Sequence, residues 1–185
     1  THPSTPEPVG ATLLNEDRYG HSIEGHTINL TLTRGTENPD PLPELGRHVI
    51  RYALQPHVGP WTASDATRAG YEFNLPLNVV SAPLQQGGLP PVSDAFLEIL
   101  TPNVMVCGLK KAEDSDALLL RLYEMEGNAC TARIRIHAAL AKAGAAARET
   151  DLLERPLEKN TARLDGDVLC VDVPAHGIVT VKIGD

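Results

Sequence analysis

The sequence predicts an all-β protein, rich in β-sandwich structure, in which part of a large sandwich precedes a smaller C-terminal sandwich. Three observations support this expectation. Apolar and polar residues alternate in many short segments, which is typical of strands with one buried face. Clusters of proline and glycine separate these segments. A single stretch, near residues 64–73, favours a short helix.

Composition excludes two classes of partner. The chain has 185 residues, of which 42% are hydrophobic and 22% charged, and both values are ordinary for a globular domain. Its net charge of −8 argues against nucleic acid, which needs a basic surface, and against an anionic membrane. No apolar run is as long as a membrane-spanning helix. We therefore expect neither nucleic acid nor membrane as a partner.

The cysteines indicate the cellular compartment of the chain, and the N-terminal residues indicate that it is part of a longer protein. The three cysteines are an odd number without a CxxC pair, so they form neither a disulfide framework nor a zinc knuckle. We interpret them as free thiols in a reducing, cytoplasmic compartment. Residues 1–9 contain Pro3, Pro6 and Pro8, which is the composition of a linker. The chain is therefore expected to be a piece of a longer protein.

The first part of the chain carries two expected strands and the expected helix. Residues 27–33 alternate strictly, and residues 47–55 do so again until Pro56, which we expect to stop the second strand. The helix begins at a cap supplied by Thr62 or Ser64 and ends at Pro76. Three aromatic residues near it are interpreted as core in preference to a sugar-stacking platform; they are Trp61, Tyr71 and Phe73.

Residues 81–93 are rich in proline and glycine and mark the expected domain boundary. We assign residues 1–88 to part of the large sandwich, with the linker 1–9 at its start, and residues 92–185 to the C-terminal sandwich. Alternation then predicts further strands over residues 95–100, 103–110, 117–125, 131–137, 168–173 and 178–183. The last two are expected to form a closing hairpin. Residues 138–147 are expected to be a loop in spite of their alanines, and residues 151–157 an edge segment.

Candidate metal sites are weak. The histidines at positions 21, 26, 48 and 57 show no ligand spacing such as HExxH, so no metal site is expected in this chain. The acidic turn at residues 113–116 lacks the ligand series of a calcium loop. The polar run at residues 15–21 has two interpretations. It is either a solvated turn with a local ion pair or a functional loop held between strands.

A resemblance to a known family is carried by several runs in a fixed order. These are LLNEDRYGHS, INLTLTR, DPLPELGRHVIRYALQPHVGPW, LKKAEDSDALLLRLYEMEG and ETDLLERPL. Together they resemble the C-terminal β-rich region of the class II α-mannosidases, glycoside hydrolase family 38. The resemblance runs from about Leu13 to the end of the chain.

The resemblance implies a function for the parent enzyme and places its catalytic groups in a different domain. Enzymes of this family hydrolyse α-mannosides with retention, using an aspartate nucleophile, a carboxylic general acid and a zinc ion in an N-terminal catalytic domain. No segment of this chain resembles that domain. We therefore expect no catalytic residue and no cofactor in this chain, with zinc in the absent catalytic domain, and an inactive isolated chain. The expected partners are the upstream catalytic domain of the same polypeptide and, through the parent enzyme, an α-mannoside.

The resemblance also singles out one loop. In the family, the loop that matches Asp17-Arg18-Tyr19-Gly20 abuts the catalytic domain, and its arginine points towards the sugar site. We therefore expect Asp17, Arg18 and Tyr19 to lie near the substrate, although Arg18 could instead form only an inter-domain salt bridge. Two other functions stay open. One is a carbohydrate-binding β-sandwich module, and the other is a purely structural or oligomerisation domain. If the first part is half of a larger sandwich, its exposed sheet edge and apolar face predict that the isolated chain self-associates through this part.

Overall fold

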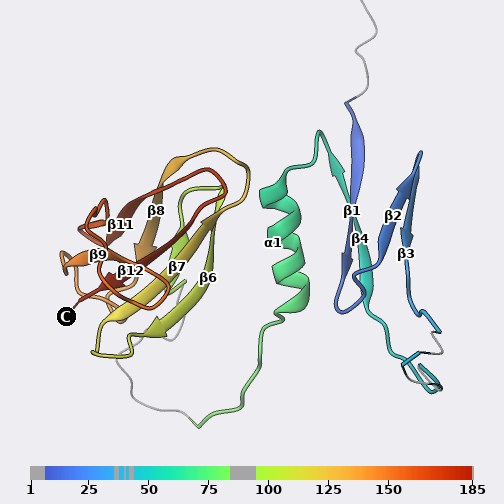
Figure 1. Ribbon diagram of the computed structural model, residues 1–185, viewed down its shortest axis with the longest axis horizontal. Helices are drawn as coiled ribbons and strands as arrows, with labels where there is room; N and C mark the ends of the chain where they lie inside the picture. The colour runs from blue at the N-terminus through green and yellow to red at the C-terminus, as the bar shows by residue number, and fades with distance from the viewer. Residues whose placement is uncertain (1–6, 36–37, 40, 42–43, 84–94, 185) are drawn as a thin grey trace, which may run out of the picture. The chain divides into compact units, whose positions relative to one another are not determined.

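The computed structural model describes residues 7–35, 38–39, 41, 44–83 and 95–184. The chain divides into two compact units, Thr1–Val80 and Ser81–Asp185. Most of the described regular structure is antiparallel β-strand, with a single α-helix among the described residues (Figure 1). The fold class is therefore as predicted. The expected domain boundary at residues 81–93 lies outside the described residues except for residues 81–83.

The second unit is a β-sandwich of two four-stranded antiparallel sheets. One sheet has the strand order β10-β11-β8-β5, and the other β6-β7-β12-β9. Their strands are β5 (Leu97–Ile99), β6 (Val104–Lys111), β7 (Leu118–Glu124), β8 (Cys130–Ile136), β9 (Ala147–Thr150), β10 (Arg163–Asp165), β11 (Val168–Val173) and β12 (Ile178–Ile183). The β6–β7 hairpin is confirmed, with an irregularity in its register between Val106 and Gly108.

The inward faces of both sheets form one hydrophobic core. Alternate residues of each strand supply it, as period-two patterning requires. Its fully buried members come from both sheets and include Leu120, Leu122, Ile134, Leu169, Val171, Val181 and Ile183. This unit therefore buries its own apolar residues without help from the first unit.

The last two strands do not form the expected hairpin. β11 pairs with β8, and β12 pairs with β7 in the other sheet, so residues 174–177 carry the chain across the sandwich. His176 has a φ of 51°, and a Cβ on Gly177 would lie 2.9 Å from the Pro174 carbonyl oxygen, so this turn is tight. The prediction was wrong because inward-facing residues alternate identically whether two strands share a sheet or face each other across a core.

Two less regular segments agree with expectation. No helix forms over residues 138–147, where turns lead from β8 into β9. Residues 151–157 fold back beside β9 through an isolated bridge between Thr150 and Pro156, and Leu157 N–H donates to the Glu149 carbonyl at 3.0 Å. The strands β9 and β10 were not predicted, because each has too few residues to show a clear period.

The first unit contains two separate antiparallel pairs and the helix (Figure 1). β1 (Val9–Asn15) pairs with β4 (Tyr52–Val58), and β2 (His21–Glu24) pairs with β3 (Thr27–Leu30). The strand expected over residues 27–33 ends at Leu30. The strand expected over 47–55 instead runs from Tyr52 through Pro56 to Val58. Proline is tolerated there because β4 has one paired edge only, so a missing N–H on the other edge breaks no ladder bond.

The helix α1 (Ala63–Asn74) is confirmed at both ends. The Thr62 hydroxyl accepts a hydrogen bond from Asp65 N–H at 3.1 Å, which satisfies one of the free donors of the first turn. At the other end Leu75 N–H donates to the Tyr71 carbonyl at 2.8 Å, directly before Pro76. The helix therefore begins and ends where its capping residues predict.

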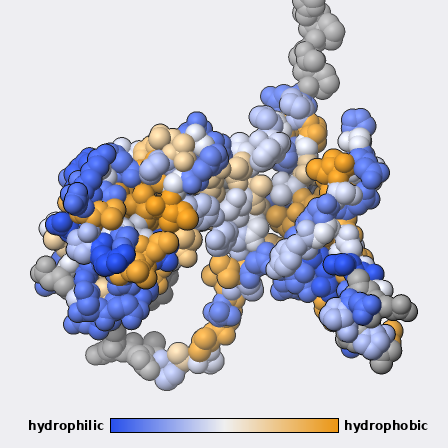
Figure 2. Space-filling view, in the orientation of Figure 1, coloured by the Kyte–Doolittle hydropathy of each residue, from blue (hydrophilic) through white to orange (hydrophobic). Residues whose placement is uncertain are grey.

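The first unit buries little of its apolar surface. Ala69 is its only buried hydrophobic residue among those the structure describes. Hydrophobic residues lie at the surface of the β2–β3 hairpin (Figure 2), and Trp61 is 71% exposed. The core assignment of Trp61 is therefore wrong for this chain, because nothing in the described part of the first unit covers the indole. That residues 1–88 complete a larger sandwich stays a prediction.

Candidate functional site

The loop between β1 and β2 carries the three residues singled out from the sequence, Asp17, Arg18 and Tyr19. It is held at its start by Asn15, whose Oδ1 accepts from Arg18 N–H at 2.8 Å. This side-chain bond bends the backbone immediately after β1. At its end Thr31 N–H donates to the Gly20 carbonyl at 2.8 Å, which joins the loop to the segment after β3.

Gly20 lies close to Thr31 at that end of the loop. A Cβ at this position would lie 3.1 Å from both the Cβ and the hydroxyl oxygen of Thr31, which is tighter than ordinary contacts. The His21 Nδ1 lies 3.1 Å from the Tyr19 carbonyl oxygen and closes the turn into β2. The loop is therefore fixed from both sides instead of extending freely into solvent.

A second set of contacts ties the loop to β4 and α1. Glu16 accepts a hydrogen bond from the Arg51 guanidinium at 3.1 Å, and the same guanidinium lies 5.5 Å from the centre of the Phe73 ring. Asn74 Nδ2 donates to the Asn15 carbonyl at 3.0 Å. Residues distant in sequence thus position this loop. Arg51 and Asn74 could not be found from the sequence, because neither belongs to a motif with local spacing.

Arg18 occupies the inner side of the loop. Its side chain is 24% exposed and its Nη1 lies 3.3 Å from an Asp17 carboxylate oxygen. Its Nε is buried and has no hydrogen-bond partner among the described residues. Burial of an unpaired donor is costly, so the guanidinium is under-satisfied in this chain.

Arg18 also acts on a neighbouring carboxylate. Gly35 N–H lowers the pKa of Glu44 most, burial opposes this, and Arg34 N–H together with the positive charges of His48 and Arg18 lowers it further. Both N–H groups lie 2.5 Å from the Glu44 carboxylate. The charge of Arg18 is thus the smallest of these influences that lower the pKa of Glu44.

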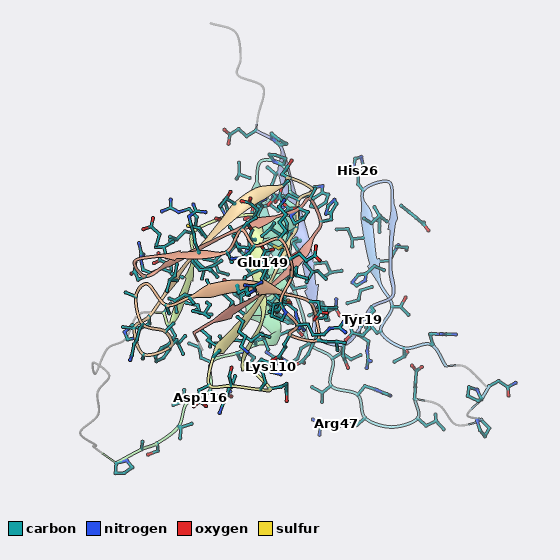
Figure 3. All side chains as sticks on the ribbon, turned by 60° about the vertical axis from the view of Figure 1, so that its left-hand side comes forward. Tyr19, His26, Arg47, Lys110, Asp116 and Glu149 are labelled. Atoms are coloured by element: carbon teal, nitrogen blue, oxygen red, sulfur yellow. The ribbon has the colours of Figure 1, made fainter. Side chains whose placement is uncertain are left out.

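Tyr19 lies on the outer side of the loop. The residue is 83% exposed. Its position is labelled in Figure 3. The structure therefore gives the three residues different settings, with Arg18 half-enclosed, Asp17 half-exposed as its partner and Tyr19 open to solvent.

The four histidines considered as ligands do not converge. In the part of the chain that the structure describes, no three His, Cys, Asp or Glu side chains lie close enough to share a metal ion. His48 Nε2 lies 2.7 Å from the Glu44 carbonyl oxygen, and the His57 ring lies against the backbone of Gly10. Among the described residues these histidines therefore belong to no group that could hold a metal ion. Nor is any described helix long and apolar enough to cross a membrane.

Comparison with known proteins supports the resemblance. Residues 103–182 match the family described as the glycosyl hydrolases family 38 C-terminal beta sandwich domain. The chain is 34% identical to human Alpha-mannosidase 2C1 over 150 residues, which is 80% of this chain and 14% of that protein. It is 30% identical to Alpha-mannosidase G of Dictyostelium discoideum over 122 residues, 66% of this chain and 11% of that protein.

A solved structure shows the same fold. The crystal structure of an alpha-mannosidase from Enterococcus faecalis V583 aligns with a TM-score of 0.55 at 18% identity, covering 74% of this chain and 14% of that one. This chain thus spans about one seventh of the relatives named above or less. It contains a C-terminal β-sandwich domain of glycosyl hydrolase family 38.

Proposed function

We propose that this chain is the non-catalytic C-terminal β portion of an α-mannosidase-like glycoside hydrolase and that it supports the catalytic domain of the same polypeptide. The family match, the α-mannosidase relatives and the short share of them that it spans support this proposal. The parent would hydrolyse α-mannosidic bonds with retention in the cytoplasm. Its nucleophile, general acid and zinc would lie outside these residues, in the larger part of the parent that this chain does not span.

The structural environment of Arg18 gives the strongest support to this proposal. A guanidinium with a buried, unpaired Nε sits on a loop that is fixed to β4 and α1. Arg18 Nη1 is paired with Asp17, but its Nε donor has no partner among the described residues, and a guanidinium with a free donor suits a carboxylate or a sugar hydroxyl. We propose that Arg18 braces an active-site carboxylate of the catalytic domain or binds a mannose hydroxyl. Asp17 orients its guanidinium, and Tyr19 lies beside the substrate path.

The test is steady-state kinetics of Arg18→Ala in the full-length enzyme. Loss of charged hydrogen bonds near the transition state should lower kcat/KM by about 10- to 100-fold, with zinc content unchanged. Arg18→Lys should recover little of the lost kcat/KM, because the lysine ammonium lacks the planar pair of donors of a guanidinium. Arg133→Ala is the matched control, since Arg133 is exposed on β8 and should leave the kinetics unchanged.

An inter-domain salt bridge without a role at the sugar site predicts a different result. Arg18→Ala would then lower the melting temperature of the full-length enzyme while kcat/KM stayed at the wild-type value. That outcome would reject the proposed role of the loop at the sugar site and would leave the supporting role of the chain in place.

The exposed apolar surface of the first unit fits this supporting role. Tyr52, Leu54 and Val58 on β4 are all exposed, as is Ile23 on β2. Soluble monomers rarely expose so many apolar residues together. We propose that other parts of the parent polypeptide cover this surface, with α1 and the strands of the first unit completing a larger sandwich.

A further inference from the structure

A polar cavity of about 340 Å³ lies between α1 and the β1–β4 pair. A helix packed on a sheet normally fills this layer with large aliphatic side chains at crystal-like density. Here the lining is mostly polar and opens to solvent. Its polar members come from both strands, the connecting loop and the helix, and include Gln55, His57, Asp65, Arg68 and Glu72.

The sheet contributes small or polar residues to this layer. The register pairs Gly10 with His57 and Thr12 with Gln55, so all four lie on the same face of β1 and β4. The His57 ring lies directly over Gly10, where a Cβ would come within 2.4 Å of its Cε1. Glycine at position 10 thus makes room for the imidazole at the cavity wall.

The helix faces the cavity with charged residues. Asp65, Arg68 and Glu72 are separated by three and four positions, which places them along one stripe of a helix. Ala69, the buried residue of the helix, lies within this stripe. Asp65 and Glu72 are exposed, so α1 presents two carboxylates and a guanidinium around the buried Ala69 where it lines the cavity.

Trp61 stands at the rim of the cavity, between β4 and α1. It is the only tryptophan in the chain and is largely exposed. An exposed indole beside a polar cavity has both parts of an amphipathic binding surface. The flat ring offers an apolar face, and the cavity offers hydrogen-bond donors and acceptors.

We propose that this cavity binds a neutral pyranose ring. Trp61 would stack on the C–H face of the sugar, while the carboxylates accept from its hydroxyls and Arg68 donates to them. A volume of 340 Å³ lies at the small end of ligand pockets, which span about 300–1,000 Å³ and so suit a monosaccharide. The lining holds two carboxylates and one guanidinium, so its net negative charge disfavours a phosphate.

The proposal does not depend on Arg18. Thr12 precedes Asn15 by three residues on β1, so the cavity lies about 10 Å along the strand from the start of the Asp17–Tyr19 loop. It uses none of the loop residues. A failure of pyranose binding and a failure of the Arg18 kinetics are therefore separate results.

The test uses the emission of Trp61 as a reporter, since no other tryptophan contributes in this chain. We would titrate the 185-residue chain with methyl α-D-mannopyranoside and, in parallel, with sorbitol, which has similar hydroxyls but no ring face. The expected result is a saturable emission change with the pyranoside at millimolar concentrations and none with sorbitol. A change that never saturates, or an equal response to sorbitol, would overturn the proposal.

Variants locate the binding. Glu72→Gln should weaken pyranoside binding about fivefold, because a charged acceptor becomes a neutral one. Tyr71→Phe is the matched control, since Tyr71 is the adjacent helix residue outside the cavity lining, and it should change binding less than twofold. Trp61→Ala, followed by saturation-transfer NMR of the sugar instead of fluorescence, should abolish the signal. Full transfer in Trp61→Ala would contradict the proposed stacking, and equal weakening by both helix variants would contradict the assigned lining.

Discussion

Glu124 shows how one residue holds several turns of the sandwich together. Its side chain is only 2% exposed although it carries a carboxylate. One oxygen accepts from Asn103 Nδ2 and Glu126 N–H, each at 2.8 Å, and the other from the N–H groups of Gly127 and His176 at 2.8 and 2.9 Å. Burial by itself raises the pKa of Glu124, but these hydrogen bonds outweigh it and lower the pKa to about 2.

This carboxylate predicts an acid-dependent stability. Since the folded pKa lies below the ordinary value of 4.5, the stabilisation is fully present above about pH 4.5 and is lost as the pH falls towards 2. Glu124→Gln should lower the free energy of unfolding of the second unit at pH 6. Between pH 4.5 and 3 this free energy should then fall less steeply than in the unmodified chain. Urea unfolding of both proteins at pH 6 and pH 3 measures this.

Glu158→Gln provides the control for the acid experiment, because Glu158 is exposed. It should unfold like the unmodified chain at both pH values. An equal pH dependence in Glu124→Gln and the unmodified chain would show that other carboxylates dominate the acid response. The network around Glu124 could not be predicted from sequence, since its donors lie in three separate connections.

At the scale of elements, the sequence predicts the two ends of α1 correctly, because a single residue determines each end. Thr62 as cap and Pro76 as terminator placed α1 at both ends. Alternation located most strands of the sandwich within two or three residues. It failed for the partners of β11 and β12 and for the passage of β4 through Pro56, because pairing depends on residues far away in the chain.

The cap of α1 provides the prediction at this scale. Thr62→Ala removes the hydroxyl that accepts from Asp65 N–H and should destabilise the first unit by about 0.5–2 kcal/mol. Thermal unfolding followed by circular dichroism at 222 nm measures the change. Thr67→Ala is the control within the same helix, because alanine favours a helix interior and should not destabilise it. Equal losses in both variants would argue against a capping role for Thr62.

At the scale of the whole molecule the two units differ in self-sufficiency. The second has a continuous core between two sheets, whereas the first has one buried hydrophobic residue among those described. The sequence could predict the apolar residues of the first unit but not their exposure, because exposure depends on which residues pack over them. The Asp17–Tyr19 loop was located by resemblance, while the contacts that fix it were visible only in the structure.

This difference predicts how the isolated chain behaves in solution. The first unit should drive self-association, so light scattering coupled to gel filtration should give a concentration-dependent mass above 19.9 kDa. A fragment of residues 95–185 should stay monomeric, because its apolar residues are already buried. A monomeric full chain at every concentration would contradict our account of the first unit.

The most direct test of our central claim combines two assays on the purified 185-residue chain, namely zinc content by mass spectrometry and hydrolysis of a chromogenic α-mannoside. Our account predicts neither bound zinc nor turnover, because the reacting groups would lie elsewhere in the parent polypeptide. Stoichiometric zinc together with turnover would contradict it and would place the active site within these residues. His21, His26, His48 and His57 would then be the first residues to replace.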